Sequence, residues 1–219
     1  MLVVCNLMEK DLENIPNLKL TLQNAGCEFT LALRLQGDFD FKPDFDCILT
    51  QGENIGNPQG LNLQIRENEA HLKDGIAIIA PDIEMPINWL LKANQASEAL
   101  SDTGLVGFKW RPVEGRVEVL NGIEIEQTGK IFGCIFISPR AFQKCGFFLE
   151  VSKYGLWDNE YHMRTQRAGF RNYYLKGYES KHKPSSRDNE VRKFKDTEMN
   201  KAYHLVNKYA DIIYHNPYK

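Results

Sequence analysis

Short apolar runs and amphipathic segments follow one another along the first hundred residues of the chain. Apolar runs of three to five residues are typical of buried strands, whereas apolar residues three or four positions apart, such as Leu18, Leu22 and Ala25, are typical of helices. The expected strands are residues 3–5, 29–35, 47–49 and 76–80, and the expected helices are residues 12–25, 61–72 and 88–100. This alternation predicts an α/β fold with a mostly parallel central sheet.

The second half of the chain has a mixed pattern. Short strands are expected at residues 105–110 and 116–120, paired as a hairpin around residues 112–115, followed by a strand at 131–137 and another at 173–175. Helices are expected at residues 139–145, 158–168 and 189–209, with a flexible loop at 183–187 before the last one. We therefore expect one domain over residues 1–183, with residues 184–219 forming a loop and helix packed on it.

Composition narrows the class of protein. No apolar run of the 219 residues approaches the ~20 that a membrane span needs, so no membrane association is expected. The first residues lack a basic segment followed by a long apolar one, which argues against a secretory signal. The five cysteines are widely spaced and contain no CxxC pair, so neither a disulfide framework nor a zinc site is expected. These features favour the reducing cytoplasm.

Charge is distributed unevenly. The net charge is −2, yet residues 160–219 carry 13 basic and 7 acidic residues. This basic third is either a solvated terminal helix or a surface that faces an anionic partner, such as the phosphates of a nucleotide, a lipid carrier or a nucleic acid.

Two acidic residues follow the apolar run at 76–80. Asp82 and Glu84 stand at the expected carboxyl end of a strand, which is the edge where open α/β sheets bind ligands. Two carboxylates at one point are suited to a hard divalent cation such as Mg²⁺ or Mn²⁺. The alternative is a structural one, since Asp82 could simply form a strand-end turn or cap the next helix.

A third acidic residue opens the expected helix at 158–168. Asp158 stands at a place that suits a general base, with Glu160 two positions later as the other candidate. A carboxylate at this position could equally be the N-cap of the helix.

Several motifs follow one another in a particular order. They are an Asn- and Gly-containing loop and helix start (53–56 and 60–62), the acidic motif (81–84), a Gly-containing strand and helix (133–142 and 145–148), the second acidic segment (155–164), and the later Arg, Gly and His residues (167–170 and 181–183). This order resembles that of family 2 glycosyltransferases of the GT-A fold. The resemblance covers roughly residues 1–183, and it rests on the ordered set of motifs rather than on any one of them.

The resemblance implies an enzyme that moves a sugar from a nucleoside diphosphate sugar, with a UDP-sugar favoured, to an acceptor hydroxyl with inversion. It implies that Asp82, Glu84 and His182 hold Mn²⁺ or Mg²⁺ and that Asp158 or Glu160 is the base. A solvated loop histidine is the alternative for His182. The donor would be contacted by the residues matching the remaining motifs, namely Asp38, Asn54, Gly56, Asn62, Gly133, Trp157 and Arg164. Packing is the alternative for Trp157, and an exposed helix surface is the alternative for Arg164.

Small stand-alone sugar transferases of this kind resemble those that phages use to glycosylate hydroxymethylcytosine in their DNA, so this base is one expected acceptor. Its basic contacts to the DNA phosphates would be Lys181, Lys183, Arg187, Arg192 and Lys193. The rival acceptors are a cell-surface glycan and a protein side chain. Two other functions stay open: nucleotidyl transfer on a related fold, and a non-catalytic module that binds carbohydrate or nucleic acid. The first strand is not followed by a glycine-rich loop, which disfavours nucleotidyl transfer, and the missing GxGxxG disfavours a Rossmann oxidoreductase.

Overall fold

The computed structural model describes residues 1–111, 115–127, 131, 133–183, 193–194, 196–201 and 203. The helices, including two short 3₁₀ turns, are η1 (Glu9–Asn14), α1 (Ile15–Gln23), α2 (Asn57–Glu67), η2 (Glu69–His71), α3 (Trp89–Ala99), α4 (Pro139–Cys145) and α5 (Trp157–Arg167). The strands are β1 (Leu2–Leu7), β2 (Thr30–Gln36), β3 (Ile48–Gly52), β4 (Ile76–Ile79), β5 (Ile83–Glu84), β6 (Thr103–Gly107), β7 (Arg116–Leu120), β8 (Ile123–Gln127), β9 (Ile135–Ile137), β10 (Arg171–Leu175) and β11 (Lys181–His182).

Nine of the described strands form one sheet in the order β3-β2-β1-β4-β9-β6-β10-β8-β7. Strands β1 to β4 pair in parallel, and β6 and β10 run in the same direction. Strand β9 runs against β4 and β6, and β8 runs against β10 and β7. The predicted α/β fold with a mostly parallel central sheet is confirmed, because within the described residues only β8 and β9 run opposite to the rest.

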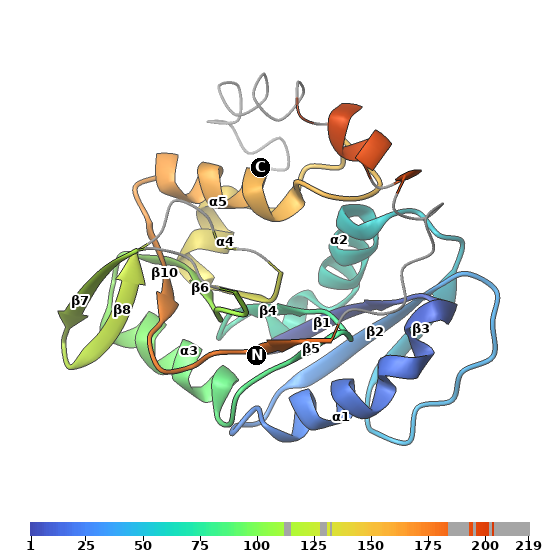
Figure 1. Ribbon diagram of the computed structural model, residues 1–219, viewed down its shortest axis with the longest axis horizontal. Coiled ribbons are helices and arrows are strands. Elements are labelled where there is room, and N and C mark those ends of the chain that lie inside the picture. The colour runs from blue at the N-terminus through green and yellow to red at the C-terminus, as the bar shows by residue number, and fades with distance from the viewer. Residues whose placement is uncertain are drawn as a thin grey trace.

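Each face of the sheet is covered by helices (Figure 1). Alternate residues of β1 divide between the faces: Val3 and Cys5 belong to the apolar cluster on the side of α1 and α3, and Leu2 and Val4 to the cluster on the side of α2, α4 and α5. Burial on both faces explains why the central strands are continuous apolar runs rather than alternating ones. No helix within the described residues is long and apolar enough to cross a membrane.

The expected hairpin around residues 112–115 is wrong. The hairpin joins β7 to β8 and turns at Asn121 and Gly122, whose φ angles are 50° and 78°. Two successive positive φ angles are what a two-residue hairpin turn requires, and Asn-Gly is the sequence that adopts them most readily. The sequence therefore carried the signal for this turn. Strand β6 pairs instead with β9 and β10.

Two other expectations need correction, and a third is untested. Helix α2 begins at Asn57 inside the expected loop, because Pro58 suits the first turn of a helix. The two-residue strands β5 and β11 were not expected at all, and they pair with each other. The expected helix at 189–209 lies mostly outside the described residues, so the boundary between residues 183 and 184 stays a prediction.

The segment that follows β4 is held along both of its edges. On one edge β5 pairs with β11 in antiparallel register. On the other edge, side chains of one face of α1 take up its backbone groups: the Asn17 amide donates to the Pro81 carbonyl at 2.8 Å, and the Asn24 amide donates to the Met85 carbonyl at 2.9 Å. Between them the Thr21 hydroxyl donates to the Ile83 carbonyl at 3.0 Å and accepts from the Met85 amide at 3.1 Å.

We expect Thr21→Val to destabilise the protein, because it preserves the shape of a fully buried side chain but leaves two backbone groups unpaired. Each unpaired buried group costs about 1–3 kcal/mol. The free energy of unfolding, measured in urea, should fall accordingly.

Thr50→Val is the matched control. The Thr50 hydroxyl is also buried, but it has no hydrogen-bond partner among the described residues. Its removal should leave the free energy of unfolding unchanged or raise it. Equal losses in the two variants would contradict the role of Thr21 in holding this segment.

Candidate active site

The first candidate residues lie at the carboxyl end of β4. Asp82 stands three residues beyond the end of the strand, and its Oδ2 lies 3.2 Å from Nε2 of His182 in β11. The backbone adds to this contact, since the Lys183 amide donates to the Asp82 carbonyl at 2.7 Å. The structure therefore brings together two of the three expected metal ligands, which are 100 residues apart in the sequence.

Glu84, the third expected ligand, is engaged differently. Its Oε1 lies 3.0 Å from Nζ of Lys181, and its Oε2 lies 3.2 Å from Nζ of Lys183. The hydrogen bonds from these two lysines hold the pKa of the Glu84 carboxyl below its usual value. The carboxylate of Glu84 thus faces two ammonium groups rather than the Asp82–His182 pair.

The separation and the chemistry of the Asp82 and His182 side chains fit a divalent cation. An octahedral ion with bonds of about 2.1 Å holds adjacent ligand atoms about 3 Å apart, which is close to the separation between these two side chains. A carboxylate with an imidazole is a donor set that Mn²⁺ accepts. Within the described residues no group of three His, Cys, Asp or Glu side chains is placed to hold a metal. The protein would therefore supply two ligands, which leaves the remaining positions to phosphate and water.

Asp158 occupies the second position of α5, so it is not the N-cap. The N-cap is Leu156, which has a φ of 59°, in the left-handed region. The Asp158 carboxylate accepts hydrogen bonds from the Gly133 amide at 3.3 Å and the Asn159 amide at 2.9 Å. Burial raises the pKa of this carboxyl above its usual value, and these hydrogen bonds and the positive charge of Arg111 oppose the rise in part. A raised pKa and a fixed position are both properties of a general base.

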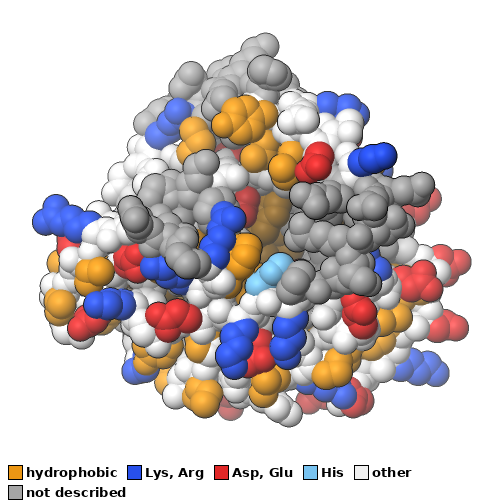
Figure 2. Space-filling model, viewed as in Figure 1, with side chains coloured by type: hydrophobic (Ala, Val, Ile, Leu, Met, Phe, Trp, Pro, Cys, Tyr) orange, Lys and Arg blue, Asp and Glu red, His pale blue; other side chains and the backbone are white. Residues whose placement is uncertain are grey.

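Gly133 and Trp110 connect Asp158 to the Asp82–His182 pair. A Cβ atom added at Gly133 would lie 3.1 Å from Cδ1 of Ile83, which stands between Asp82 and Glu84, and 3.5 Å from Nε1 of Trp110. The Trp110 ring in turn lies 4.7 Å from the His182 ring, centre to centre. Figure 2 shows this face of the molecule hollowed near its centre, with hydrophobic side chains inside and a histidine at the rim.

Two residues of this neighbourhood were missed by the sequence analysis. The guanidinium of Arg111 lies 4.9 Å from the centre of the Trp110 ring, and its charge acts on Asp158. Trp110 is the last residue of the expected strand 105–110. Because ligands of open α/β sheets bind at the carboxyl ends of strands, its position could have identified it as a site residue. Nothing in the sequence distinguishes Arg111 from other exposed arginines.

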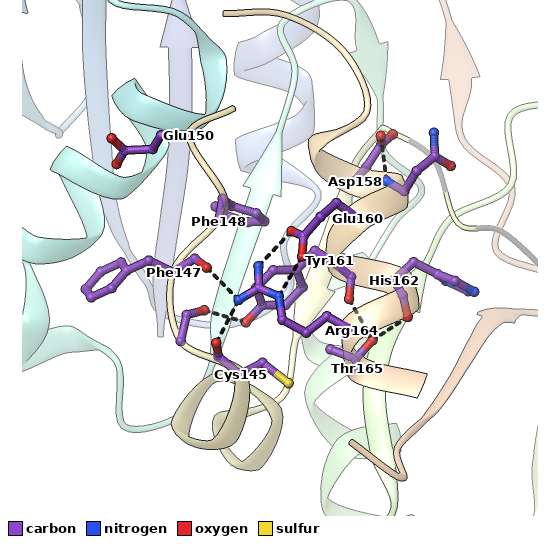
Figure 3. Close-up of polar contacts among 12 residues, drawn as sticks. Cys145, Phe147, Phe148, Glu150, Asp158, Glu160, Tyr161, His162, Arg164 and Thr165 are labelled. Atoms are coloured by element: carbon purple, nitrogen blue, oxygen red, sulfur yellow. Dashed lines mark hydrogen bonds and ion pairs between the residues drawn. The ribbon is translucent and has the colours of Figure 1, made fainter. Parts of the chain in front are cut away.

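Glu160 and Arg164 lie in the protein interior. Their side chains are 2% and 6% exposed, and both carboxylate oxygens of Glu160 accept hydrogen bonds from Arg164 at 2.7 Å (Figure 3). The same guanidinium donates to the carbonyl groups of Cys145 and Phe147 at 2.7 and 2.8 Å. These contacts tie α5 to the end of α4, and they leave neither charged group directed at a donor or an acceptor.

Two of the expected donor contacts also have structural partners. Asn62 is fully buried, and its amide donates to the Phe148 carbonyl and to Glu150 while its oxygen accepts from the Phe148 amide. The Trp157 ring packs edge-on against Phe148, 5.2 Å between centres. Both residues stabilise the segment that leads into α5.

The remaining expected donor contacts lie around the loop between β3 and α2 and after β2. The Asn54 oxygen accepts from the Tyr154 hydroxyl at 2.7 Å, and Gly56 is the N-cap of α2 with a φ of 101°. Asp38 is exposed just beyond β2. These residues border the same carboxyl edge as Asp82, because β1, β2 and β4 are parallel neighbours.

No protein-family model matches the sequence, and no curated protein matches it. Solved structures do match. The mannosyltransferase PcManGT from Pyrobaculum calidifontis, in complex with GDP-Man and Mn²⁺, aligns with a TM-score of 0.64 at 15% identity over 98% of this chain and 64% of that one.

Residues 1–349 of TarS from S. aureus, in complex with UDP-GlcNAc, align with a TM-score of 0.62 at 11% identity over 87% of this chain and 60% of that one. Drosophila β1,4-galactosyltransferase 7 with xylobiose aligns with a TM-score of 0.58 at 16% identity over 94% and 79% of the two chains.

These likenesses show that the chain has the fold of the GT-A glycosyltransferases. The chain spans only 36% of another TarS structure's chain and 42% of the GalNAc-T7 chain, so the matched glycosyltransferases include larger proteins.

Substitutions of the two candidate bases by the matching carboxamides should affect stability in different ways. The raised pKa of Asp158 means that the folded state binds this proton more tightly than the unfolded state, so stability falls as the pH rises from the unfolded pKa, about 3.9, through the folded one. Asp158→Asn removes this loss. Its Tm relative to the wild type should therefore be higher at pH 8 than at pH 4, and a difference that does not change with pH would contradict the burial of this charge.

Glu160→Gln is the matched carboxamide variant. It leaves the Arg164 charge without its partner in the interior, which costs about 3–5 kcal/mol and lowers the Tm by about 6–20 °C. Differential scanning calorimetry of both variants measures the contrast.

Proposed function

We propose that this protein transfers a sugar from a nucleoside diphosphate sugar to an acceptor hydroxyl. The observation that carries the proposal is the gathering of the Asp82–His182 pair and the fixed carboxylate of Asp158 around Gly133 and Trp110, at the carboxyl edge of a GT-A sheet. The fold supports this class of reaction. The two possible metal ligands and the fixed carboxylate support it independently of the fold.

Asp82 and His182 are the residues that would hold Mn²⁺ or Mg²⁺ beside the donor diphosphate. Such an ion, when bound, neutralises the charge that develops on the departing nucleoside diphosphate. Lys181 and Lys183 flank His182 in sequence and bring two further positive charges to this edge, partly offset by Glu84. The indole of Trp110 packs on His182 and limits the movement of its ring.

Asp158 acts as the base in the proposed reaction. Its carboxylate takes the proton of the acceptor hydroxyl while the hydroxyl oxygen bonds to the anomeric carbon. The bond from that carbon to the diphosphate oxygen breaks on the opposite face, and the diphosphate leaves with the electron pair, so the configuration is inverted. Glu160 is the less favoured base, because Arg164 occupies both of its oxygens.

The donor nucleotide and the acceptor are open to test. PcManGT is described with GDP-Man and TarS with UDP-GlcNAc, so both nucleotides are donor candidates for this chain. A glycan hydroxyl is the acceptor we favour. Modified DNA stays a prediction without support from the described contacts: Lys181 and Lys183 bind Glu84, Lys193 is exposed, and Arg187 and Arg192 lie outside the described residues.

We expect nucleotide binding to depend on Asp82 and His182 and to be sensitive to chelation. Asp82→Ala and His182→Ala should each weaken Mn²⁺-dependent binding of UDP or GDP by 10-fold or more in isothermal titration calorimetry, because each removes one of two protein ligands. Glu84→Gln is the control, and it should change the Kd by much less. Full binding and turnover in EDTA would contradict the metal role.

Asp158→Asn should lower kcat by roughly 10²–10⁴ while the donor Kd stays near the wild-type value. Asp102→Asn is the matched control. Asp102 pairs with Arg171, the first residue of β10, at the amino end of a strand parallel to β4 and so away from the carboxyl edge, and its substitution should leave kcat unchanged. Donor binding without turnover in the wild type, across a panel of acceptors, would favour the non-catalytic binding module instead.

A further inference from the structure

Strand β3 is one edge of the nine-stranded sheet, and its outer side has no neighbouring strand among the described residues. Its backbone pairs with β2 on the inner side. The only other backbone hydrogen bond of β3 in the described part of the chain runs from the Gly37 amide to the Gly52 carbonyl at 2.8 Å. The outer side of β3 is therefore a row of N–H and C=O groups that a further strand could pair with.

Natural proteins usually protect such an edge with charged side chains, and β3 lacks this protection. None of its five residues is charged, and Ile48 and Leu49 are each 41% exposed. The opposite edge of the sheet differs, since β7 carries Arg116 and Glu118. An uncharged edge with exposed apolar side chains is suited to bind an extended segment.

The two exposed apolar side chains lie on opposite faces of the sheet. Leu49 stands beside Leu33 of β2, which belongs to the apolar cluster on the side of α1 and α3. Ile48 stands beside Ala32, which belongs to the cluster on the side of α2. A strand added to this edge would meet one of these side chains on each face.

The segment that leads into β3 carries a line of carboxylates. From residue 38 to residue 47 the even positions are exposed and the odd positions are less so, and Phe39, Phe41 and Phe45 pack in the cluster on the side of α1. Four of the five exposed positions are aspartates and one is a lysine, hence a net charge of −3. We call the four aspartates the acidic ridge: Asp38, Asp40, Asp44 and Asp46.

Most of the acidic ridge has no partner of opposite charge. Within the described part of the chain only Asp44 takes part in an ion pair, with the Lys19 ammonium, and this hydrogen bond lowers the pKa of the Asp44 carboxyl. Figure 2 shows acidic side chains gathered at the right of the view, on the side where Figure 1 places β3 and the loop before it. The charge of this surface favours a basic partner.

A second copy of this chain does not suit the same edge. Antiparallel pairing of two β3 strands centred on Leu49 would place Asp46 of each copy opposite Gly52 and beside Glu53 of the other copy. Like charges that face each other across strands are destabilising. The partner is therefore expected to carry the opposite charge.

We propose that β3 binds an extended segment of a partner protein in which basic and apolar residues alternate. The backbone of this segment pairs with the outer edge of β3 and adds one strand to the sheet. Its side chains point alternately to the two faces. Those on the side of α1 meet Leu49 and the acidic ridge, which suits lysine or arginine, because the aliphatic stem covers Leu49 and the charged end faces the carboxylates. Those on the other face meet Ile48, which suits an apolar residue. This surface is independent of the proposed transfer reaction.

The test is the binding of a rhodamine-labelled peptide of four Lys-Val repeats to the whole protein, measured by fluorescence anisotropy. The same peptide with methylated backbone nitrogens keeps the side chains but cannot donate hydrogen bonds to the edge. A peptide of four Glu-Val repeats keeps the backbone and reverses the charge. We expect the Lys-Val peptide to bind at least about 10-fold more tightly than either control, and its affinity to fall as salt is added.

Two substitutions of one exposed residue separate the role of this surface from an effect on folding. Leu49→Lys and Leu49→Glu remove the same apolar side chain and each place a charge on the edge. Leu49→Lys should weaken binding of the Lys-Val peptide by about 10-fold or more, whereas Leu49→Glu should retain it, because only the lysine repels the peptide. Val119→Lys is the control on the opposite edge, where Val119 is 64% exposed, and it should leave the affinity unchanged.

Neutralising the acidic ridge tests the charge directly. Asp40→Asn, Asp44→Asn and Asp46→Asn together should weaken binding of the Lys-Val peptide by about 10-fold at low salt and by less at high salt. The matched control removes three exposed carboxylates elsewhere and should change the Kd much less: Glu69→Gln, Glu98→Gln and Glu124→Gln.

The outcomes are distinct. Failure of the wild type to bind the Lys-Val peptide, equal binding of its N-methylated form, or equal affinities of Leu49→Lys and Leu49→Glu would each overturn the proposal. A wild-type dimer in sedimentation velocity that Leu49→Lys converts to a monomer would assign the edge to a second copy and overturn the basic partner.

Discussion

The site depends on how the short segment after β4 is held. Residues 81–85 would be an irregular loop if their backbone groups had no partners, and the Asp82 carboxylate would then have no fixed position. Two parts of the chain far apart in sequence supply the partners: β11 pairs with one edge of β5, and Asn17 and Thr21 of α1, with its C-cap Asn24, bind the other side. The contact between Asp82 and His182 is a consequence, since β11 is the strand that carries the histidine.

The buried pair of Glu160 and Arg164 holds α5 in position, as the side chains of α1 hold β5. The helix starts at a strained left-handed Leu156, so its first turn needs other contacts to keep its position. Arg164 provides them by binding both Glu160 and the carbonyl groups at the end of α4. Asp158, two residues before Glu160, is thereby presented to the Gly133 amide without taking part in the supporting network.

The long apolar strands and the amphipathic helices could be predicted from the sequence, because their periodicity is set by burial on one or both faces. The two-residue strands β5 and β11 could not, because a segment of that length carries no periodic signal and their pairing joins residues about 100 positions apart. The polar face of α1 at positions 17, 21 and 24 was visible in the sequence, but such a face normally points to water. Its role appears only once the 81–85 segment lies against it.

Contacts between residues far apart in sequence also explain why Glu84 was expected to be a metal ligand. Two carboxylates at i and i+2 on a strand point the same way, which favours a shared cation when only the local sequence is considered. The partner strand changes this, because Lys181 and Lys183 stand on either side of His182 and neutralise Glu84. Part of the positive charge of the last third of the chain is therefore paired with a carboxylate of the same chain, at the same edge of the sheet as Asp82. An excess of lysine and arginine in a sequence is evidence for an external anionic partner only to the extent that internal carboxylates do not already bind it.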